Sequence, residues 1–527
     1  MDTEATRAVP FNRRLALLLA MAMFVLVVDT SLMNVSISAV VEDLGTTVSG
    51  VQGAIALEAL VSAAFILIGG KTGDLIGRKL AYVLGLLGYA IGAIAMTLAQ
   101  NLTAIIVFWA VIGGLGASLL LPAMQSLIHG NFEGANQKRV YALVGASAAI
   151  AAAVGPLLGG FITTFLSWRV GFLLEAVIIA VVLSGIKLVH DVPYEGSRAV
   201  DWVGAAISVV GMGGVVLGIL IWQEGGSYVG VVIGIGVVAL GSLAWWLRDR
   251  KRRGRATLVD PGLFGSKLFR TGVSGQLMQQ IALGGTMIVL PIYLQMVLGY
   301  NALLSGVSIA PLSLSMFAIA LLAGRRGTGR PSSIILLGFT LLVLGLAALV
   351  LVVPRADSGW WLTLPLVVAG CGLGMLVSQL NNYTLSPISD ERVSEAAGVN
   401  SAAGSFGLSF GLAFAGAIML ATLSLLFTSR AESSSVLAPE EQQQVATALE
   451  KDAQVFSDAH LQELLVDQPS DVQDEIVAIN TDVRPIALQV ALAIPILAGL
   501  LGVGIAVRMR RLPDPAPSAA GESVLGG

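Results

Sequence analysis

The chain has 527 residues, of which 56% are hydrophobic and only 12% are charged. A soluble protein carries about twice that share of charged residues, so the composition excludes an ordinary soluble protein and leaves room for many apolar spans of ~20 residues. The single cysteine, Cys371, and three dispersed histidines predict neither a disulfide nor a metal site. Because no Walker loop and no Ser-His-Asp arrangement is visible, we expect no enzyme activity and no cofactor.

Fourteen apolar stretches follow one another along the chain, each long enough to cross a membrane. Backbone polar groups find no partner in lipid, so each stretch is predicted to be an α-helix and the fold class to be an all-α membrane protein. The predicted helices cover residues 15–41, 52–70, 80–99, 103–128, 140–165, 170–189, 202–223, 229–247, 271–298, 304–323, 332–353, 361–383, 396–427 and 486–507.

Lysine and arginine are distributed unevenly over the segments that join these helices. If the N-terminus lies in the cytoplasm, all but five of the 30 bases fall in inner segments, the exceptions being Arg169, Arg355, Arg430, Lys451 and Arg484. Positive residues favour the cytoplasmic side of a membrane. We therefore expect a cytoplasmic N-terminus at 1–14, a cytoplasmic tail at 508–527, and a multi-pass protein of a bacterial cytoplasmic membrane.

Two connections are long enough to carry structure of their own. The inner one, 248–270, is strongly basic and is expected to anchor the topology on anionic lipid; a partner or nucleic-acid site is the alternative that we do not expect. The outer one, 428–485, is rich in acids and predicts a helical hairpin with pieces near 439–457 and 458–480. This hairpin is either a packed, solvated insert or a lid or partner surface.

Residues 70–79 read Gly70-Lys-Thr-Gly-Asp-Leu-Ile-Gly-Arg-Lys79 between two apolar helices. Glycines permit a tight turn and close helix approach, and Asp74 is expected to accept backbone N–H groups at a neighbouring helix start. The segment resembles the loop between the second and third helices of the major facilitator superfamily. The resemblance implies a conformational latch made of Gly70, Gly73, Asp74, Gly77, Arg78 and Lys79, with Glu133 from the next inner loop.

Three further stretches resemble the fourteen-helix drug:proton antiporter branch of that superfamily. They are Asp29-Thr-Ser-Leu-Met-Asn34-Val in the first helix, the antiporter motif residues Gly155, Pro156, Gly159 and Gly160 in the fifth, and Gln295-Met-Val-Leu-Gly299-Tyr300 at the end of the ninth. A Gly-Pro pair bends a helix and lets a neighbour approach. The sequence departs from the branch at Ala110, where an arginine associated with proton coupling usually stands, and at Ala151.

The resemblance implies the major facilitator fold. Its N-terminal six-helix half would cover 15–189 and its C-terminal half 271–507, with two inserted helices at 202–247 between them. Residues Gly324–Arg330 weakly resemble the 70–79 pattern and lie between the tenth and eleventh predicted helices, the corresponding position in the second half. This is expected for an internal repeat.

Three acids lie inside predicted helices, at Asp29, Glu58 and Glu175. A charge at membrane depth costs at least about 2.5 kcal/mol, so such groups face a cavity, find a partner or take up a proton. All three are candidate proton-coupling residues. A structural hydrogen bond to a neighbouring helix is the alternative for Asp29, and a simple pair with Arg169 is the alternative for Glu175.

The second half has polar stripes in place of buried charge. Each stripe occupies one helix face, with Gln276, Gln279 and Gln280 on the ninth helix and Ser378, Asn381 and Asn382 on the twelfth. These amides either bond neighbouring helices or line an inner mouth for polar parts of a substrate. The predicted substrate cavity consists of Asp29, Asn34, Glu58, Gln125, Gln276, Gln279, Gln280, Asn381 and Asn382.

These features favour a monomeric, proton-driven multidrug efflux antiporter that exports cationic or neutral lipophilic small molecules by alternating access and confers antibiotic resistance. Its partners would be the amphiphilic substrate, protons and membrane lipids, with no nucleic acid. A lipid or secreted-metabolite exporter on the same fold is the second hypothesis. The third is a membrane sensor or scaffold that uses the outer hairpin.

Overall fold

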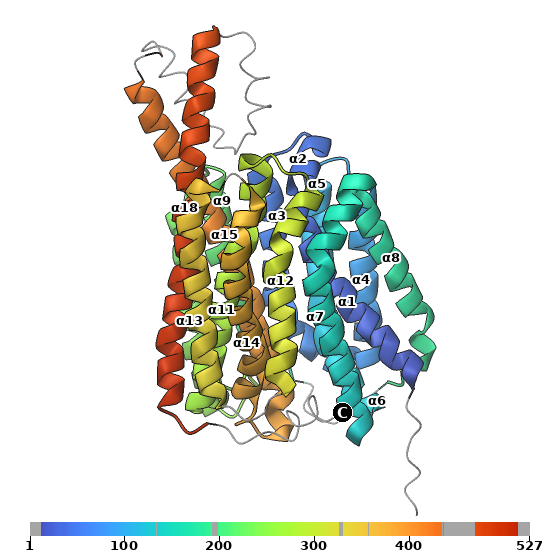
Figure 1. Ribbon diagram of the computed structural model, residues 1–527. Coiled ribbons are helices and arrows are strands. Elements are labelled where there is room, and N and C mark those ends of the chain that lie inside the picture. The colour runs from blue at the N-terminus through green and yellow to red at the C-terminus, as the bar shows by residue number, and fades with distance from the viewer. Residues whose placement is uncertain are drawn as a thin grey trace, which may run out of the picture.

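The computed structural model describes residues 12–132, 134–191, 199–325, 330–356, 358–434, 436 and 469–514, and within these ranges the chain is helical with no strand (Figure 1). The helices are α1 Arg13–Val35, α2 Ile37–Leu44, α3 Val48–Ile76, α4 Arg78–Leu98, α5 Leu102–Ala104, η1 Ile105–Gly113, α6 Gly114–Asn131, α7 Gly134–Phe165, α8 Trp168–Ser184, η2 Ile186–Leu188, α9 Trp202–Gln223, α10 Val229–Arg252, η3 Pro261–Gly265, α11 Lys267–Ile292, η4 Tyr293–Val297, α12 Ala302–Arg325, α13 Pro331–Val352, η5 Val353–Arg355, η6 Gly359–Leu362, α14 Thr363–Leu385, α15 Asp390–Ser433 and α18 Ser470–Arg510.

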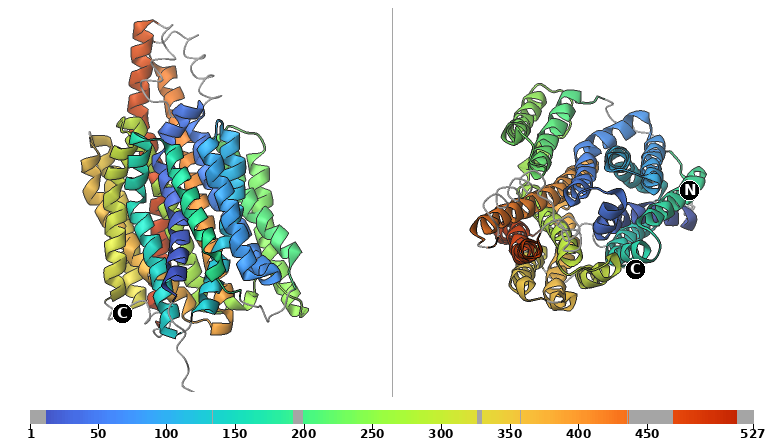
Figure 2. Two further views of the ribbon diagram at one scale, coloured as in Figure 1. Left: turned by 90° about the vertical axis from the view of Figure 1, so that its right-hand side faces the viewer. Right: turned by 90° about the horizontal axis from the view of Figure 1, so that it is seen from above.

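Fourteen helices in the described ranges are long and apolar enough to cross a membrane, which confirms the predicted number. Helices α1 to α8 form one bundle and α11 to α18 the other. The bundles meet where α7 packs on α12 and α3 packs on α15. The inserted helix α9 covers the α3–α15 junction and carries α10 on its outer side, as the view from above shows (Figure 2).

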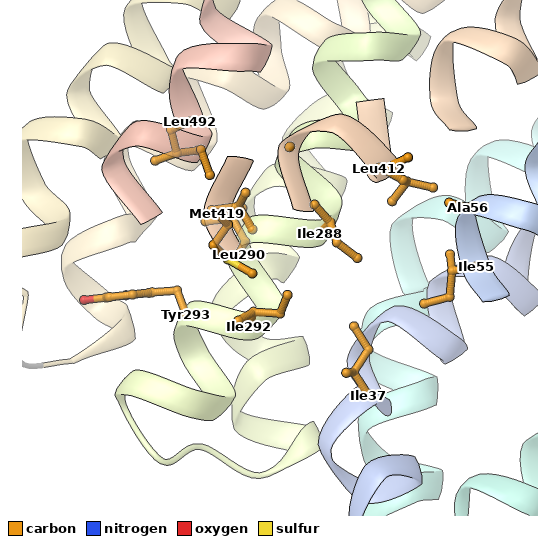
Figure 3. Close-up of a cluster of buried hydrophobic side chains, with 14 of the residues drawn as sticks. Ile37, Ile55, Ala56, Ile288, Leu290, Ile292, Tyr293, Leu412, Met419 and Leu492 are labelled. Atoms are coloured by element: carbon orange, nitrogen blue, oxygen red, sulfur yellow. The ribbon is translucent and has the colours of Figure 1, made fainter. Parts of the chain in front are cut away.

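The two halves share a buried apolar core at one end of the molecule. We call this end, which carries α2 and α5, the α2 end, and the end where α1 begins and α18 finishes the termini end (Figure 1). At the α2 end, Ile37 and Ile55 of the first half belong to the same cluster as Ile288 and Leu412 of the second (Figure 3). At the termini end, the first-half cluster around Tyr82 is distinct from the cluster around Phe269, against which Leu67 and Ile68 of α3 pack.

The first span is shorter than predicted, because α1 stops at Val35 and the chain restarts as α2. The hydroxyl of Ser36, which is fully buried, donates to the Leu32 carbonyl at 2.7 Å and lies 2.7 Å from the Thr163 hydroxyl. Serine side chains that bond the backbone in this way compete with the helix ladder. Hydropathy alone could not locate this break, since apolar residues continue on both sides.

The last span is longer than predicted. Helix α18 runs without interruption from Ser470, so the part of the outer segment after residue 469 belongs to the last span, and it rises with the end of α15 above the rest of the α2 end (Figure 1). Val472, Ile476 and Val483 are buried at helical spacing along this extension. The predicted helical piece at 439–457 and residues 458–468 of the second piece lie outside the described residues.

Arg484, predicted in an outer loop, lies inside α18 and is only 2% exposed. Its guanidinium donates to the Met296 carbonyl at 3.0 Å, at the end of the ninth span. The sequence-based estimate was wrong here because the apolar run was taken to start after this arginine. The number of bases in the predicted outer loops therefore falls from five to four. The predicted excess of bases in the inner segments remains.

The basic connection 248–270 is folded. Asp201, 1% exposed, caps α9 by accepting from the Gly204 N–H at 2.9 Å and pairs with Arg250 at 3.4 Å. Asp260 pairs with Lys251 at 2.5 Å and with Arg392 of α15 at 3.6 Å. Two of the bases expected to contact lipid thus form ion pairs: Arg250 links α10 to the start of α9, and Lys251 pairs with Asp260, which also pairs with Arg392 of the second half.

Candidate functional site

Asp29 lies at the centre of the first half and is fully buried. The Tyr89 hydroxyl of α4 donates to one of its carboxylate oxygens. The Trp109 indole N–H of η1 points at both oxygens, 3.0 Å from each. These two donors hold the carboxylate in a fixed orientation, and neither of them carries a charge.

The structure brings the other two predicted acids to the same place. Asp29 interacts electrostatically with both Glu58 of α3 and Glu175 of α8, and Tyr89 lies in the field of all three. Glu58 is 8% exposed and Glu175 is 3% exposed. Three carboxyl groups in one apolar interior cannot all ionise without a large cost, so their protonation states depend on one another.

Glu175 does not form the pair with Arg169 that the sequence allowed. Arg169 pairs with Asp43 and also donates to the Ala99 carbonyl at 2.6 Å, at the α2 end. Neither carboxylate oxygen of Glu175 has a hydrogen-bond partner among the residues that the structure describes. An isolated charge is costly to bury, so Glu175 remains a candidate proton-binding group.

Two glycines of α6 let three helices converge on this site. A Cβ at Gly114 would lie 3.0 Å from the Glu58 carbonyl oxygen of α3, and a Cβ at Gly116 would lie 2.7 Å from the Tyr89 nitrogen of α4. Only glycine permits such approach. The Gly-x-Gly pattern of this span therefore positions Glu58 and Tyr89 around Asp29.

Sequence reasoning missed Tyr89 and Trp109. Trp109 is the neighbour of Ala110, where the family pattern has an arginine, and both lie in the π-helical turn η1. A π-helix adds a residue to one turn and rotates the side chains that follow, often at functional sites. The departure from the family pattern at Ala110 was the one sequence signal that pointed to this turn.

The helix 5 motif packs α7 on both of its neighbours. A Cβ at Gly155 would lie 2.6 Å from Ser31 Cβ, and one at Gly159 would lie 2.8 Å from Leu32 Cα, both on α1. Toward the other half, a Cβ at Gly160 would lie 2.5 Å from the Ala302 carbonyl oxygen. The Pro156 carbonyl faces Gly306 of α12 in the same way. This motif therefore joins the helix that carries Asp29 to the second half.

The 70–79 segment forms the sharp turn between α3 and α4. Gly77 has φ +100°, a conformation that favours glycine, and Asp74 pairs with Arg78 at 3.6 Å. The carboxylate that accepts a backbone N–H at the start of α4 belongs to Asp191, 3.0 Å from the Lys79 nitrogen, and not to Asp74 as predicted. The Lys79 ammonium donates to the Val189 carbonyl at 2.8 Å. Glu133 lies outside the described residues.

Asp191→Ala is expected to weaken the start of α4, because the Lys79 N–H loses its acceptor. Helix-capping losses cost about 1 kcal/mol, so the apparent melting temperature of the purified protein should fall by about 1 °C at this chain length. Asp191→Asn keeps the acceptor oxygen and serves as the matched control. Equal melting of the Ala variant and the parent would show that this cap contributes nothing measurable.

The predicted amides of the second half gather against α15. Gln276 and Gln280 face Gly404, and the Asn381 side chain accepts from Asn400 at 3.2 Å. Gln279 is 2% exposed, whereas Asn381 and Gln125 are exposed and Asn382 is half-buried. Asn34, 5% exposed, lies between Asp29 and the break in α1. The three acids thus lie in the first half together with Asn34 and Gln125, whereas the other predicted amides lie in the second half.

Two helical bundles, one with buried carboxyl groups and the other with a face of amides, define a membrane transporter of the two-bundle class. The chain belongs to the Major Facilitator Superfamily, whose family model matches residues 19–201 and 192–412. This confirms the family predicted from the motifs, which comprises transporters rather than enzymes.

Curated relatives in this family are named for drug resistance and export. The probable actinorhodin transporter of Streptomyces coelicolor is 26% identical over 437 residues, covering 80% of this chain and 75% of the relative. The multidrug resistance protein Stp of Mycobacterium tuberculosis is 26% identical over 412 residues, covering 77% and 75%. The puromycin resistance protein pur8 of Streptomyces alboniger is 28% identical over 392 residues, covering 72% and 76%.

Solved structures share the fold. A bacterial homologue of the human lysosomal transporter Spinster, in an inward-facing and unoccupied conformation, has a TM-score of 0.62 at 11% identity and covers 96% of this chain and 99% of its own. A POT family transporter in complex with 5-aminolevulinic acid has a TM-score of 0.59 at 14% identity, covering 94% and 96%. At these identities the likeness concerns the fold alone.

Proposed function

We propose that this protein is a bacterial cytoplasmic-membrane exporter of lipophilic, cationic or neutral small molecules, driven by exchange for protons. The observation that carries the proposal is the cluster of Asp29, Glu58 and Glu175 in the first half. The names of the curated relatives, which include drug resistance and drug efflux proteins, support the cargo class.

The proposed direction of transport follows from the charge distribution. Exposed bases gather at the termini end, which we assign to the cytoplasm. At the α2 end, residues of both halves belong to one apolar cluster. At the termini end, the described first-half cluster around Tyr82 contains no second-half residue, although Leu67 and Ile68 of α3 pack against the cluster around Phe269. This supports a conformation closed toward the outside, in which cargo enters from the cytoplasm or the inner leaflet.

Proton exchange requires that protonation and substrate binding favour different states. Asp29 is the proposed main proton carrier, because it is fully buried at the centre of the first half and interacts electrostatically with both other acids. Glu58 and Glu175 both interact electrostatically with Asp29, so the protonation states of the three acids are linked. Entry of a cationic substrate would favour the ionised carboxylate, and a proton from outside would displace it.

Transport by the purified protein in proteoliposomes tests this function. We expect a fluorescent lipophilic cation to move against its gradient when protons are supplied on the opposite side, and to stop when an ionophore collapses the pH difference. Uptake that is unchanged by the ionophore would contradict proton exchange. Transport of a labelled phospholipid but not of the cation would favour the lipid exporter instead.

A further inference from the structure

The side chain of Gln295 crosses from the second half to the first at the α2 end. Its Oε1 accepts from the Ser38 backbone N–H at 3.0 Å and from the Ser38 hydroxyl at 2.6 Å. Its amide nitrogen donates to the Val35 carbonyl at 3.1 Å. Gln295 is 5% exposed, so these bonds form in a largely dry environment.

These partners are the backbone groups that the break between α1 and α2 leaves open. In a continuous helix the Val35 carbonyl would accept from residue 39 and the Ser38 N–H would donate to residue 34. Instead, both groups pair with the carboxamide of Gln295. An unpaired buried backbone group is costly, so a residue of the second half stabilises a break in a helix of the first.

The second half holds Gln295 firmly in this position. Gln295 lies in the π-helical turn η4, where the Tyr293 hydroxyl donates to the Val353 and Ala356 carbonyls, at 3.1 Å each. On the other side of Gln295, Arg484 donates to the Met296 carbonyl. Rigid support of this kind means that Gln295 moves with the second half as a unit.

Other contacts between the halves surround the glutamine. The Leu303 N–H donates to the Thr164 hydroxyl at 3.0 Å. Ile37, adjacent to the break, lies in the apolar cluster that contains Ile288 of the second half (Figure 3). Separation of the halves at this end must therefore withdraw Gln295 from Val35 and Ser38.

We propose that Gln295 is the gating residue of the α2 end. Its three hydrogen bonds favour the state in which this end is closed, and their loss is part of the free-energy cost of opening it. The inference requires only the two-bundle architecture. It holds whichever cargo is carried and whether or not protons drive transport.

Spin-label distance measurements on the full chain in nanodiscs test the proposal without substrate. In a Cys371→Ser background, labels at Thr103 and Trp360 report on the α2 end, and labels at Lys187 and Arg330 report on the termini end. Gln295→Ala is expected to raise the ratio of long to short distances at the α2 end about tenfold, from three interhelical bonds of modest strength. Distances at the termini end should shorten at the same time.

Gln489→Ala is the matched control, because the Gln489 amide donates to the Val350 carbonyl at 2.7 Å within the second half. It removes a comparable amide bond and should leave both distance distributions as in the parent. If Gln295→Ala does not fold, Gln295→Met keeps the side-chain length and should open the α2 end similarly. Parental distances in the folded Gln295 variant, or an equal shift in Gln489→Ala, would overturn the proposal.

Discussion

Asp29→Asn is expected to abolish proton-driven transport while the protein still folds. Asparagine keeps the shape of the side chain and an oxygen that can accept from Tyr89 and Trp109, but it cannot bind and release a proton. When two ligands are coupled, binding of one typically changes the affinity for the other about 5–150-fold. Loss of the proton site should therefore reduce gradient-driven accumulation of the substrate by at least about fivefold. Substrate counterflow without a pH gradient measures whether the variant still binds substrate and still alternates between inward- and outward-facing states.

Asp43→Asn provides the control for this experiment. Asp43 pairs with Arg169 at the α2 end, and its side chain is 42% exposed, outside the buried cluster. This variant removes a carboxylate of the same half and should retain most gradient-driven transport. If Asp29→Asn responds to the gradient as the parent does, Asp29 is not the proton carrier. Glu58→Gln and Glu175→Gln would then test the remaining acids of the cluster.

Gly160→Ala is expected to destabilise the protein and to impair transport, although it adds only one carbon. The new Cβ would lie 2.5 Å from the Ala302 carbonyl oxygen and 2.9 Å from Leu303 Cα, both backbone atoms of α12. Overpacking of this kind costs about 1–3 kcal/mol, and it would push α7 and α12 apart where the two halves meet. Thermal unfolding of the purified protein and proteoliposome transport measure the two effects.

Gly145→Ala is the matched control on the same helix, because a Cβ at Gly145 meets no atom within 4 Å. Alanine favours a helix over glycine by about 1 kcal/mol, so this variant should melt at or above the parental temperature. The two substitutions are chemically identical but are expected to change the melting temperature in opposite directions. A Gly160→Ala protein as stable and active as Gly145→Ala would show that the close approach to α12 tolerates a methyl group.

The three buried acids illustrate how far a sequence can define a site. Each was found because carboxyl groups are rare in apolar helices, but their meeting around Tyr89 depends on the packing of four helices. The alternative partner for Glu175 was wrong because Arg169 is near it in the chain and yet pairs with Asp43. Proximity along a helix does not decide which of several carboxylates a long side chain reaches.

The turn at 70–79 also shows how far the sequence can define local structure. Glycine at 77 was predictable, because a turn this tight favours left-handed backbone, and its φ of +100° agrees. The capping role assigned to Asp74 falls to Asp191, which is 112 positions from Lys79 in the chain. An exposed aspartate after a helix carries no local pattern that distinguishes it from any other polar surface residue.

The fourteen helical spans and the family could be predicted from the sequence, because lipid forces each apolar stretch to satisfy its own backbone and hydropathy is a local property. Which polar groups meet depends on how the helices pack. Tyr89 and Trp109 lie 60 and 80 positions from Asp29, and Gln295 lies 257 positions from Ser38. Such pairs depend on glycine-mediated helix approach and on turns that break the regular helix. The break after Val35 could therefore not be located from the sequence, because the residue that stabilises it, Gln295, belongs to the other half.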